Sequence, residues 1–345
     1  MVRLKDIALR ASVSVMTVSK VMRDAPDISA ATKARVRTLA VQMGYVPDST
    51  AQTMRTRTSR FLGVLIPSIA NPTYSRILLA LEERAHEMGF EIILSHTLNQ
   101  EGREESAIQR LLARRVDGLF IAPVYRLRPE APIYDLLKAR GTPVVIMGHP
   151  APFCRQFVHV AVDDLQASYS LTQHLLQSGH RHIAYFSGPH ATPWSLERFD
   201  GYRRALREAG LEVDERLVFQ AGSSIEDGAS AALQFVNESA KATAIQAVND
   251  LVAIGCAETF LNQGVKIPRD LSVAGFGNIL TSEHFRVPLT TIREPKYRLG
   301  IAAMETMVKL IKGEAAESRR LKAELIVRGS TMGMAQAAAE ELKAP

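Results

Sequence analysis

Apolar residues near the N-terminus recur at the three- and four-residue spacing of a helix. They predict three short helices over residues 4–11, 15–22 and 30–43. Ser14 and Ser29 stand at the N-cap positions of the second and third helices, and Gly44 ends the third. The short turn 12–14 joins the first two helices into a helix-turn-helix, with the third helix expected to pack behind them.

The second helix has an unusual outward face. Val18, Val21 and Met22 form the stripe expected to face the core. The side chains left outward are Val15, Met16, Thr17, Ser19 and Lys20. Methyl groups, hydroxyls and one cation make a poor solvated surface, but they suit a DNA groove that offers thymine methyls, phosphates and guanine edges. The alternative is that Val15 and Met16 only cover a neighbouring helix.

From Phe61 onward the pattern changes to short apolar runs that alternate with amphipathic helical stretches. Eight runs are typical of strands: FLGVLIP, FEIILS, DGLFIAP, TPVVIM, FVHVAVD, HIAYFSG, TAIQAVN and LSVAGFG. This alternation predicts an α/β fold of parallel βα units. A break at residues 148–156 divides the runs four and four, which predicts two similar lobes with a cleft between them. Ligands in such folds bind at the carboxyl ends of the strands.

These patterns divide the chain into four parts. We expect a helix-turn-helix head over 1–46, a linker over 47–59, a two-lobed core over 60–330 and a tail over 331–345. The linker is polar and basic with almost no apolar face, so it is expected to fold only on a partner. The tail lacks the repeated apolar heptads of a coiled coil, which favours a dimer without a tetramer tail.

The charge and composition of the chain narrow the possible classes of protein. Residues 1–60 carry eleven Lys or Arg against four Asp or Glu, although the whole chain has a net charge of only +6. A basic excess confined to a small head is typical of a module that binds a polyanion. No apolar run reaches the roughly 20 residues of a membrane span or resembles a signal peptide, so a cytoplasmic protein without membrane contact is expected. Cys154 and Cys256 lack metal-ligand spacing and are expected to be reduced.

Nine segments occur in the order typical of one known family. They are KDIALRASVSVMTVSKVM, GYVPDSTAQTM, GVLIPSIANPTY, RRVDGLFIAP, SGHRHIAYFSGP, RFDGYRRAL, AVNDLVAIG, PRDLSVAGFGN and PLTTIREP. On these segments the chain resembles the LacI/GalR family of bacterial transcriptional regulators over essentially its whole length. The resemblance implies a homodimer on a pseudo-palindromic double-stranded DNA operator. It also implies a periplasmic-binding-protein-like (type I) core, in which a small-molecule effector changes operator affinity.

The resemblance assigns DNA contacts to the head. Base contacts fall on Val15, Met16 and Lys20, with Lys20 standing where Arg is most frequent. Phosphate contacts fall on Ser14, Thr17 and Ser19. Met54 lies where the family usually has a Leu that wedges into the minor groove at the operator centre. A surface Met on a linker is the alternative for that position.

The resemblance also assigns an effector pocket between the lobes. Its expected members are Asn71, Tyr74, His149, Asp163, Trp194, Arg198, Asn249 and Gly277, with Asp164 beside Asp163. Arg198 is the strongest candidate because a guanidinium binds carboxylates or vicinal oxygens bidentately. Asp250 is expected to cap the following helix rather than to bind ligand. Trp194, the only Trp, is equally consistent with a ring that stacks on the ligand and with a rim residue.

Two positions depart from sugar-binding relatives. Those relatives often have an Asp after the fourth strand and another in the motif GFDD, whereas this chain has Gly148 and Gly277. His149 and His96 lie nearby. With Arg198 kept and two carboxylates absent, the sequence favours an anionic or larger effector such as a sugar acid.

Two other classes of protein are alternatives to a regulator: an enzyme and a transport-type binding protein. The sequence has no G-x-G-x-x-G after the first strand, no Walker loop, no G-x-S-x-G elbow and no H-E-x-x-H, so we expect no enzyme, cofactor or metal. His180 and His182 are taken as structural. A transport-type sugar-binding protein without DNA function is the alternative for the core, and the basic head argues against it.

Overall fold

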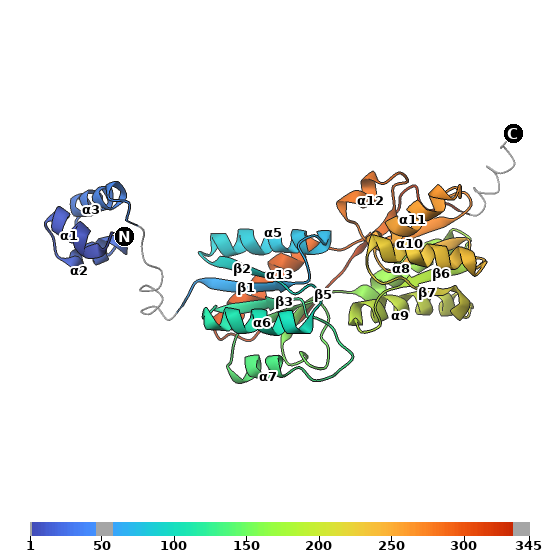
Figure 1. The fold of residues 1–345 in the computed structure, drawn as a ribbon, viewed down its shortest axis with the longest axis horizontal. Coiled ribbons are helices and arrows are strands. Elements are labelled where there is room, and N and C mark those ends of the chain that lie inside the picture. The colour runs from blue at the N-terminus through green and yellow to red at the C-terminus, as the bar shows by residue number, and fades with distance from the viewer. Residues whose placement is uncertain (1, 46–57, 334–345) are drawn as a thin grey trace. The chain divides into compact units, whose positions relative to one another are not determined.

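The computed structural model describes residues 2–45 and 58–333 and divides the chain into two compact units, residues 1–59 and 60–345. The first unit holds α1 (Leu4–Ala11), α2 (Val15–Met22) and α3 (Ala30–Gln42) (Figure 1). Ile7, Val18 and Val36 are completely buried at the centre of this unit. The hydroxyl oxygens of Ser14 and Ser29 accept hydrogen bonds from the backbone N–H groups of the third helical residue, so both predicted N-caps are confirmed.

Residues 58–333 form two six-stranded sheets, one in each lobe of the core. The strands of the first sheet run in the spatial order β11-β5-β4-β3-β1-β2, and those of the second in the order β12-β10-β9-β8-β6-β7. Their bounds are β1 (Phe61–Ile66), β2 (Glu91–His96), β3 (Gly118–Ile121), β4 (Val144–Met147), β5 (Val158–Val162), β6 (Ile183–Ser187), β7 (Val218–Gln220), β8 (Ala244–Ala247), β9 (Ser272–Gly277), β10 (Thr290–Arg293), β11 (Arg319–Leu321) and β12 (Glu324–Ile326). The described strands pair in parallel except β10 with β12.

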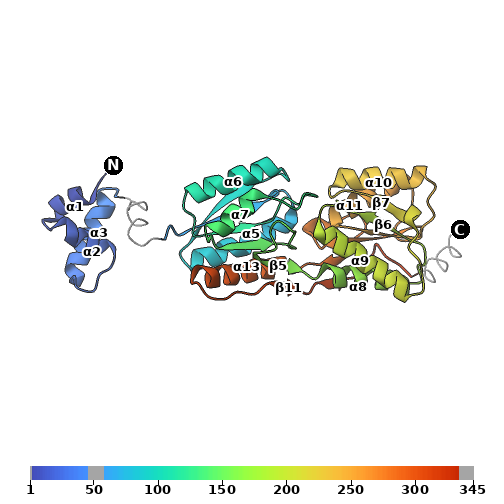
Figure 2. The ribbon, with the colours of Figure 1, turned by 90° about the horizontal axis from the view of Figure 1, so that it is seen from below.

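Helices cover both faces of each sheet (Figures 1 and 2). In the first lobe, α5 (Pro72–Glu87) packs with α13 (Lys296–Ile311) on one face, while α6 (Glu101–Ala113) and α7 (Pro132–Ala139) cover the other. In the second lobe, α8 (Asp164–Gln177) pairs with α9 (Pro193–Glu208), and α10 (Ile225–Asn237) pairs with α11 (Asp250–Asn262) on the opposite face. The 3-10 helix η1 (Glu215–Leu217) and α12 (Leu280–His284) complete this lobe. The α/β prediction is therefore confirmed.

The pairs α10–α11 and α8–α9 approach closely because glycines lie at their contacts. A Cβ on Gly255 would lie 1.9 Å from the carbonyl oxygen of Ile225, and one on Gly201 would lie 2.3 Å from the carbonyl oxygen of Leu165. No side chain fits at such separations, so glycine at these sites sets how closely the helices pack.

The predicted division of strands between the lobes is wrong. All eight predicted runs form strands, but β5 pairs with β4 and belongs to the first sheet, and β7, β10, β11 and β12 were missed. The reason is that the chain passes between the lobes three times within residues 58–333, near residues 163, 294–295 and 322–323. Consequently α13 and β11 return to the first lobe after the strands β6 to β10 of the second.

Two further findings concern the cysteines and the helices. Cys154 and Cys256 are both buried and free, as predicted. Among residues 2–45 and 58–333, no helix combines the length and the apolar character that a membrane crossing needs.

Candidate functional site

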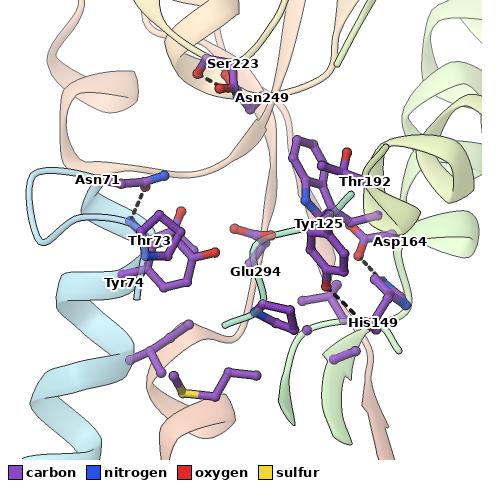
Figure 3. A pocket seen from close by; sticks show the side chains of 18 of the residues that line it. Asn71, Thr73, Tyr74, Tyr125, His149, Asp164, Thr192, Ser223, Asn249 and Glu294 are labelled. Carbon is purple, nitrogen blue, oxygen red and sulfur yellow. Dashed lines mark hydrogen bonds and ion pairs between the residues drawn. The ribbon is translucent and has the colours of Figure 1, made fainter. Parts of the chain in front are cut away.

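A cavity of about 330 Å³ lies between the two lobes of the core (Figure 3). This volume is at the lower end of the range for small-molecule sites. Polar side chains from both lobes line it: Asn71, Thr73, Tyr74, Tyr125, His149, Asp164, Thr192, Arg198, Ser223, Asn249 and Glu294. Apolar and aromatic groups supply the rest of the wall, among them Ile77, Val162, Trp194 and Phe276.

Arg198, on α9, is the centre of a buried hydrogen-bond network. Its Nε donates to Asp164 Oδ1 at 2.6 Å, one terminal nitrogen donates to the Val248 carbonyl at 2.7 Å, and the other donates to Glu294 Oε1 at 2.9 Å. The guanidinium carbon also lies 3.5 Å from the ring centre of Phe276 and 4.9 Å from that of Trp194. Arg198 is thus fixed in place, and these bonds use one N–H of each of its three guanidinium nitrogens.

The two carboxylates beside Arg198 have different environments. Burial raises the pKa of Glu294, and the attraction of Arg198 offsets only part of this rise. Burial also acts to raise the pKa of Asp164, but Arg198 and His149 outweigh it and hold this pKa below its usual value. Asp164 is therefore firmly ionised, and the Arg198 charge is already matched within the protein.

His149 links the lobes at the base of the cavity. It follows β4 in the first lobe, and its Nε2 lies 2.6 Å from Asp164 Oδ2 at the start of α8 in the second. Tyr125 donates its hydroxyl hydrogen to the His149 carbonyl at 2.8 Å. A second contact between the lobes lies nearby, where Arg320 pairs with both carboxylate oxygens of Glu197.

The opposite side of the cavity is formed by two helix N-termini. Asn71 caps α5 by accepting from the Thr73 N–H at 3.0 Å. Asn249 caps α11 by accepting from the Val252 N–H at 2.8 Å, and its amide donates to the Ser223 carbonyl. Figure 3 shows Asn71 on the first lobe and Asn249 beside Ser223 on the second, both above Tyr74 and Glu294 in this view. Polar groups of both lobes thus face the same cavity.

Most of the predicted pocket residues do line this cavity. They are Asn71, Tyr74, His149, Trp194, Arg198 and Asn249. Asp163 does not line it, because its carboxylate caps α8 by accepting from the Gln166 N–H, and Asp164 faces the cavity instead. Gly277 and His96 are also outside the lining, although the neighbouring Phe276 is part of it.

Glu294 is the most important residue that the sequence analysis missed. It directly follows β10, and the residues just after parallel strands are where ligands bind. The signal was present, but the run LTTIR was not recognised as a strand. Tyr125 and Ser223 were missed for a different reason, since they lie on loops without a motif.

The structure shows which groups lie beside Gly148 and Gly277, the positions of the two absent aspartates. A Cβ on Gly148, where φ is +133°, would lie 2.9 Å from the Tyr125 hydroxyl. A Cβ on Gly277, where φ is +136°, would lie 3.7 Å from Glu294 Oε2 and 3.5 Å from Asp250 Oδ2. The Tyr125 hydroxyl therefore crowds the side-chain position at Gly148, whereas a Cβ at Gly277 would be in ordinary contact with Asp250 and Glu294.

The prediction that Asp250 caps α11 is also wrong, because Asn249 has that role. Asp250 is the first residue of the helix, and its buried carboxylate accepts from the Ile279 N–H and from the hydroxyls of Ser282 and Thr291. It joins α11 to the loop after β9, to α12 and to β10, and it is not part of the cavity lining.

The outward face of α2 is as the sequence pattern predicts. Val15 is 47% exposed and Met16 is 70% exposed, so they do not cover a neighbouring helix. Ser14 and Thr17 hydrogen-bond to each other through their hydroxyls, and Lys20 forms an ion pair with Asp27 in the turn between α2 and α3. The DNA contacts assigned to these residues and to Ser19 stay predictions. Met54 lies outside the described residues.

The fold and the site together define a two-lobed small-molecule-binding core joined to a helix-turn-helix head. The family profile described as "Bacterial regulatory proteins, lacI family" matches residues 3–48. The profile described as "Periplasmic binding proteins and sugar binding domain of LacI family" matches residues 59–329. The chain belongs to the LacI family, and it is a DNA-binding transcriptional regulator rather than an enzyme.

Individual relatives agree with this assignment. The transcriptional repressor CytR of Escherichia coli K12 is 31% identical over 333 residues, which cover 96% of each chain. A structure of the lac repressor dimer bound to operator and an anti-inducer superposes with a TM-score of 0.86 at 26% identity, covering 96% of this chain and 99% of that one. A complex of the regulator CelR with cellobiose gives a TM-score of 0.72 at 28% identity, covering 96% and 100%.

Proposed function

We propose that this regulator is a cytoplasmic repressor that binds a pseudo-palindromic operator as a homodimer and responds to a neutral, hydroxyl-bearing effector. The lac repressor structure supports the first part, because that protein is a dimer on its operator and its fold matches this chain along nearly the whole length. The observation that carries the second part is the network in which Arg198 is bound by Asp164 and Glu294.

The charges in the cavity argue against an anionic effector. The sequence favoured a sugar acid because two expected carboxylates were absent, but that reasoning did not count Glu294. Two carboxylates lie within hydrogen-bonding distance of the Arg198 guanidinium, and one of them, Glu294, also lies 3.8 Å from Lys296, so the cations beside the cavity are already paired. An added anion would bring a further negative charge to a buried site that already has a matched cation. The expectation of a sugar acid is therefore replaced by a neutral ligand.

The same groups suit hydroxyls. A hydroxyl both donates and accepts, so a pair of neighbouring hydroxyls can donate to a carboxylate oxygen and accept from the remaining N–H groups of Arg198. Glu294 Oε2 lies 3.8 Å from the Lys296 ammonium nitrogen. It can still accept a hydrogen bond from a ligand hydroxyl. Tyr74, Trp194 and Phe276 provide apolar surface for the carbon face of the ligand.

The test uses the intact protein and two readouts. Trp194 is the only Trp in the chain and lines the cavity, so its fluorescence reports ligand binding directly. Neutral sugars, glycosides and nucleosides are titrated beside their matched acids and phosphates, and each ligand found is then added to the protein bound to an operator chosen from random duplexes. We expect saturable binding of a neutral ligand that changes operator affinity.

Two results would contradict the proposal in different ways. Binding of acids alone would show that the effector class is wrong while leaving the regulator intact. A protein that binds a sugar but shows no salt-dependent affinity for any duplex would instead be the transport-type alternative.

A further inference from the structure

The ion pair between Lys20 and Asp27 lies on the surface that is expected to face DNA. Lys20 is in the last turn of α2, and its ammonium nitrogen is bound to Asp27 Oδ2. This hydrogen bond holds the pKa of Asp27 below its usual value, so Asp27 is a carboxylate. The carbonyl of Lys20 also accepts from the N–H groups of Arg23 and Ala25, which fixes the turn that leads to Asp27.

Stability does not account for this pair. The side chains of Lys20 and Asp27 are 37% and 53% exposed, and an ion pair in contact with solvent contributes little to folding. A carboxylate near the phosphate backbone is also unfavourable for binding DNA of any sequence. The turn has a second acidic residue, Asp24, but that one pairs with Lys33 and Arg37 of α3. Only Asp27 of these two is paired with a residue of α2.

We propose that Asp27 is a specificity-determining residue of the head, which directs the Lys20 ammonium away from phosphates and toward base edges. A lysine is a flexible point charge and donates equally well to a phosphate oxygen or to guanine O6 and N7. The carboxylate of Asp27 restricts the positions of the ammonium and repels a phosphate that approaches it. The repulsion between Asp27 and phosphate applies to DNA of every sequence. A guanine within reach of the Lys20 ammonium adds a favourable contact that other bases do not offer.

The inference rests on the operator binding proposed above, and a selection experiment separates the two. The wild-type chain is first used to select duplexes from a randomised library; failure to enrich any sequence would count against operator binding itself. Dissociation constants are then measured for the selected duplex and for an unrelated duplex of equal length over a series of salt concentrations. Their ratio is the specificity of each variant.

Asp27→Asn is the test substitution, and Asp24→Asn is the matched control because it removes the same charge from the same turn. We expect Asp27→Asn to bind the unrelated duplex about fivefold to tenfold more tightly, with a salt dependence steeper by about one phosphate contact. Its affinity for the selected duplex should rise less, so that the specificity ratio falls. Asp24→Asn should leave this ratio unchanged, and Asp27→Glu should restore it.

If Asp27 acts by positioning Lys20, the effect of Asp27→Asn must depend on Lys20. In a background of Lys20→Ala, the substitution Asp27→Asn should no longer change the specificity ratio. The proposal is overturned if Asp27→Asn leaves the ratio unchanged, if Asp24→Asn lowers it equally, or if the effect persists without Lys20. Thermal unfolding of each variant, followed by circular dichroism, checks that the exposed substitutions leave the head folded.

Discussion

Glu294→Gln is the most direct test of the charge argument at the effector cavity. The substitution keeps the size of the side chain and an oxygen that accepts from Arg198, while it removes one negative charge. A ligand carboxylate bound to the same guanidinium nitrogen as Glu294 Oε1, which lies at 2.9 Å, would lie about 6 Å from that oxygen. Unit charges at this distance repel by about 3 kcal/mol at an effective dielectric constant of about 20.

This repulsion predicts a change of selectivity. A penalty of about 3 kcal/mol corresponds to about a hundredfold in affinity as an upper value, so we expect Glu294→Gln to bind an acid tenfold to a hundredfold better relative to its neutral parent. The assay is Trp194 fluorescence, titrated with the neutral ligand found in the panel and with its uronic or aldonic acid. Glu226→Gln, an exposed carboxylate on α10, is the matched control and should leave the ratio unchanged.

The reasoning is refuted if Glu294→Gln alters both affinities equally, because the charge would then have no role in choosing the ligand. It is also refuted if the wild-type protein binds the acid more tightly than the neutral parent.

Three further predictions concern other parts of the chain. Gly255→Ala should lower the free energy of unfolding by about 2 kcal/mol or more, since the new Cβ would lie 1.9 Å from the Ile225 carbonyl oxygen; Gly102→Ala on α6, where nothing lies within 4 Å, should be neutral or slightly stabilising in the same urea titration. Ionised Asp164 stabilises the folded state above its usual pKa of 3.8, and this stabilisation is lost as the pH falls through the lower pKa of the folded protein. The urea midpoints at pH 7 and pH 3 should therefore differ less in Asp164→Asn than in the wild type. An equal difference would contradict a lowered pKa for Asp164. Met54→Ala should weaken specific operator binding in a mobility-shift assay while effector binding is kept, and unaltered affinity would remove Met54 from the interface.

How far the sequence predicts this protein depends on whether the determining contacts are local. Val15 and Met16 were assigned to an exposed face from helical periodicity alone, and Ser14 and Ser29 from capping preferences, because both signals lie within one helix. The assignment of β5 failed because lobe membership follows from strand pairing, and a chain that passes between the lobes three times leaves no local sign of it.

The chemistry of the cavity shows the same limit. Arg198 was identified from its motif, but its partners Asp164 and Glu294 come from segments far apart in the chain. The expectation of an anionic effector was therefore made without counting Glu294, although Arg198 itself was correctly placed. Likewise, Lys20 was placed on the correct face, yet its pairing with Asp27 depends on the course of the turn and not on a spacing rule.

The repeated passage of the chain between the lobes also governs how the protein is made. During synthesis the first lobe emerges early, but α13 supplies Ala303, Met304 and Met307 to its core, and β11 closes the edge of its sheet. Both elements leave the ribosome only after almost all of the second lobe. The first lobe must therefore wait, with apolar surface uncovered, until α13 and β11 have been synthesised, and neither lobe can be inherited, deleted or exchanged as one continuous stretch of gene.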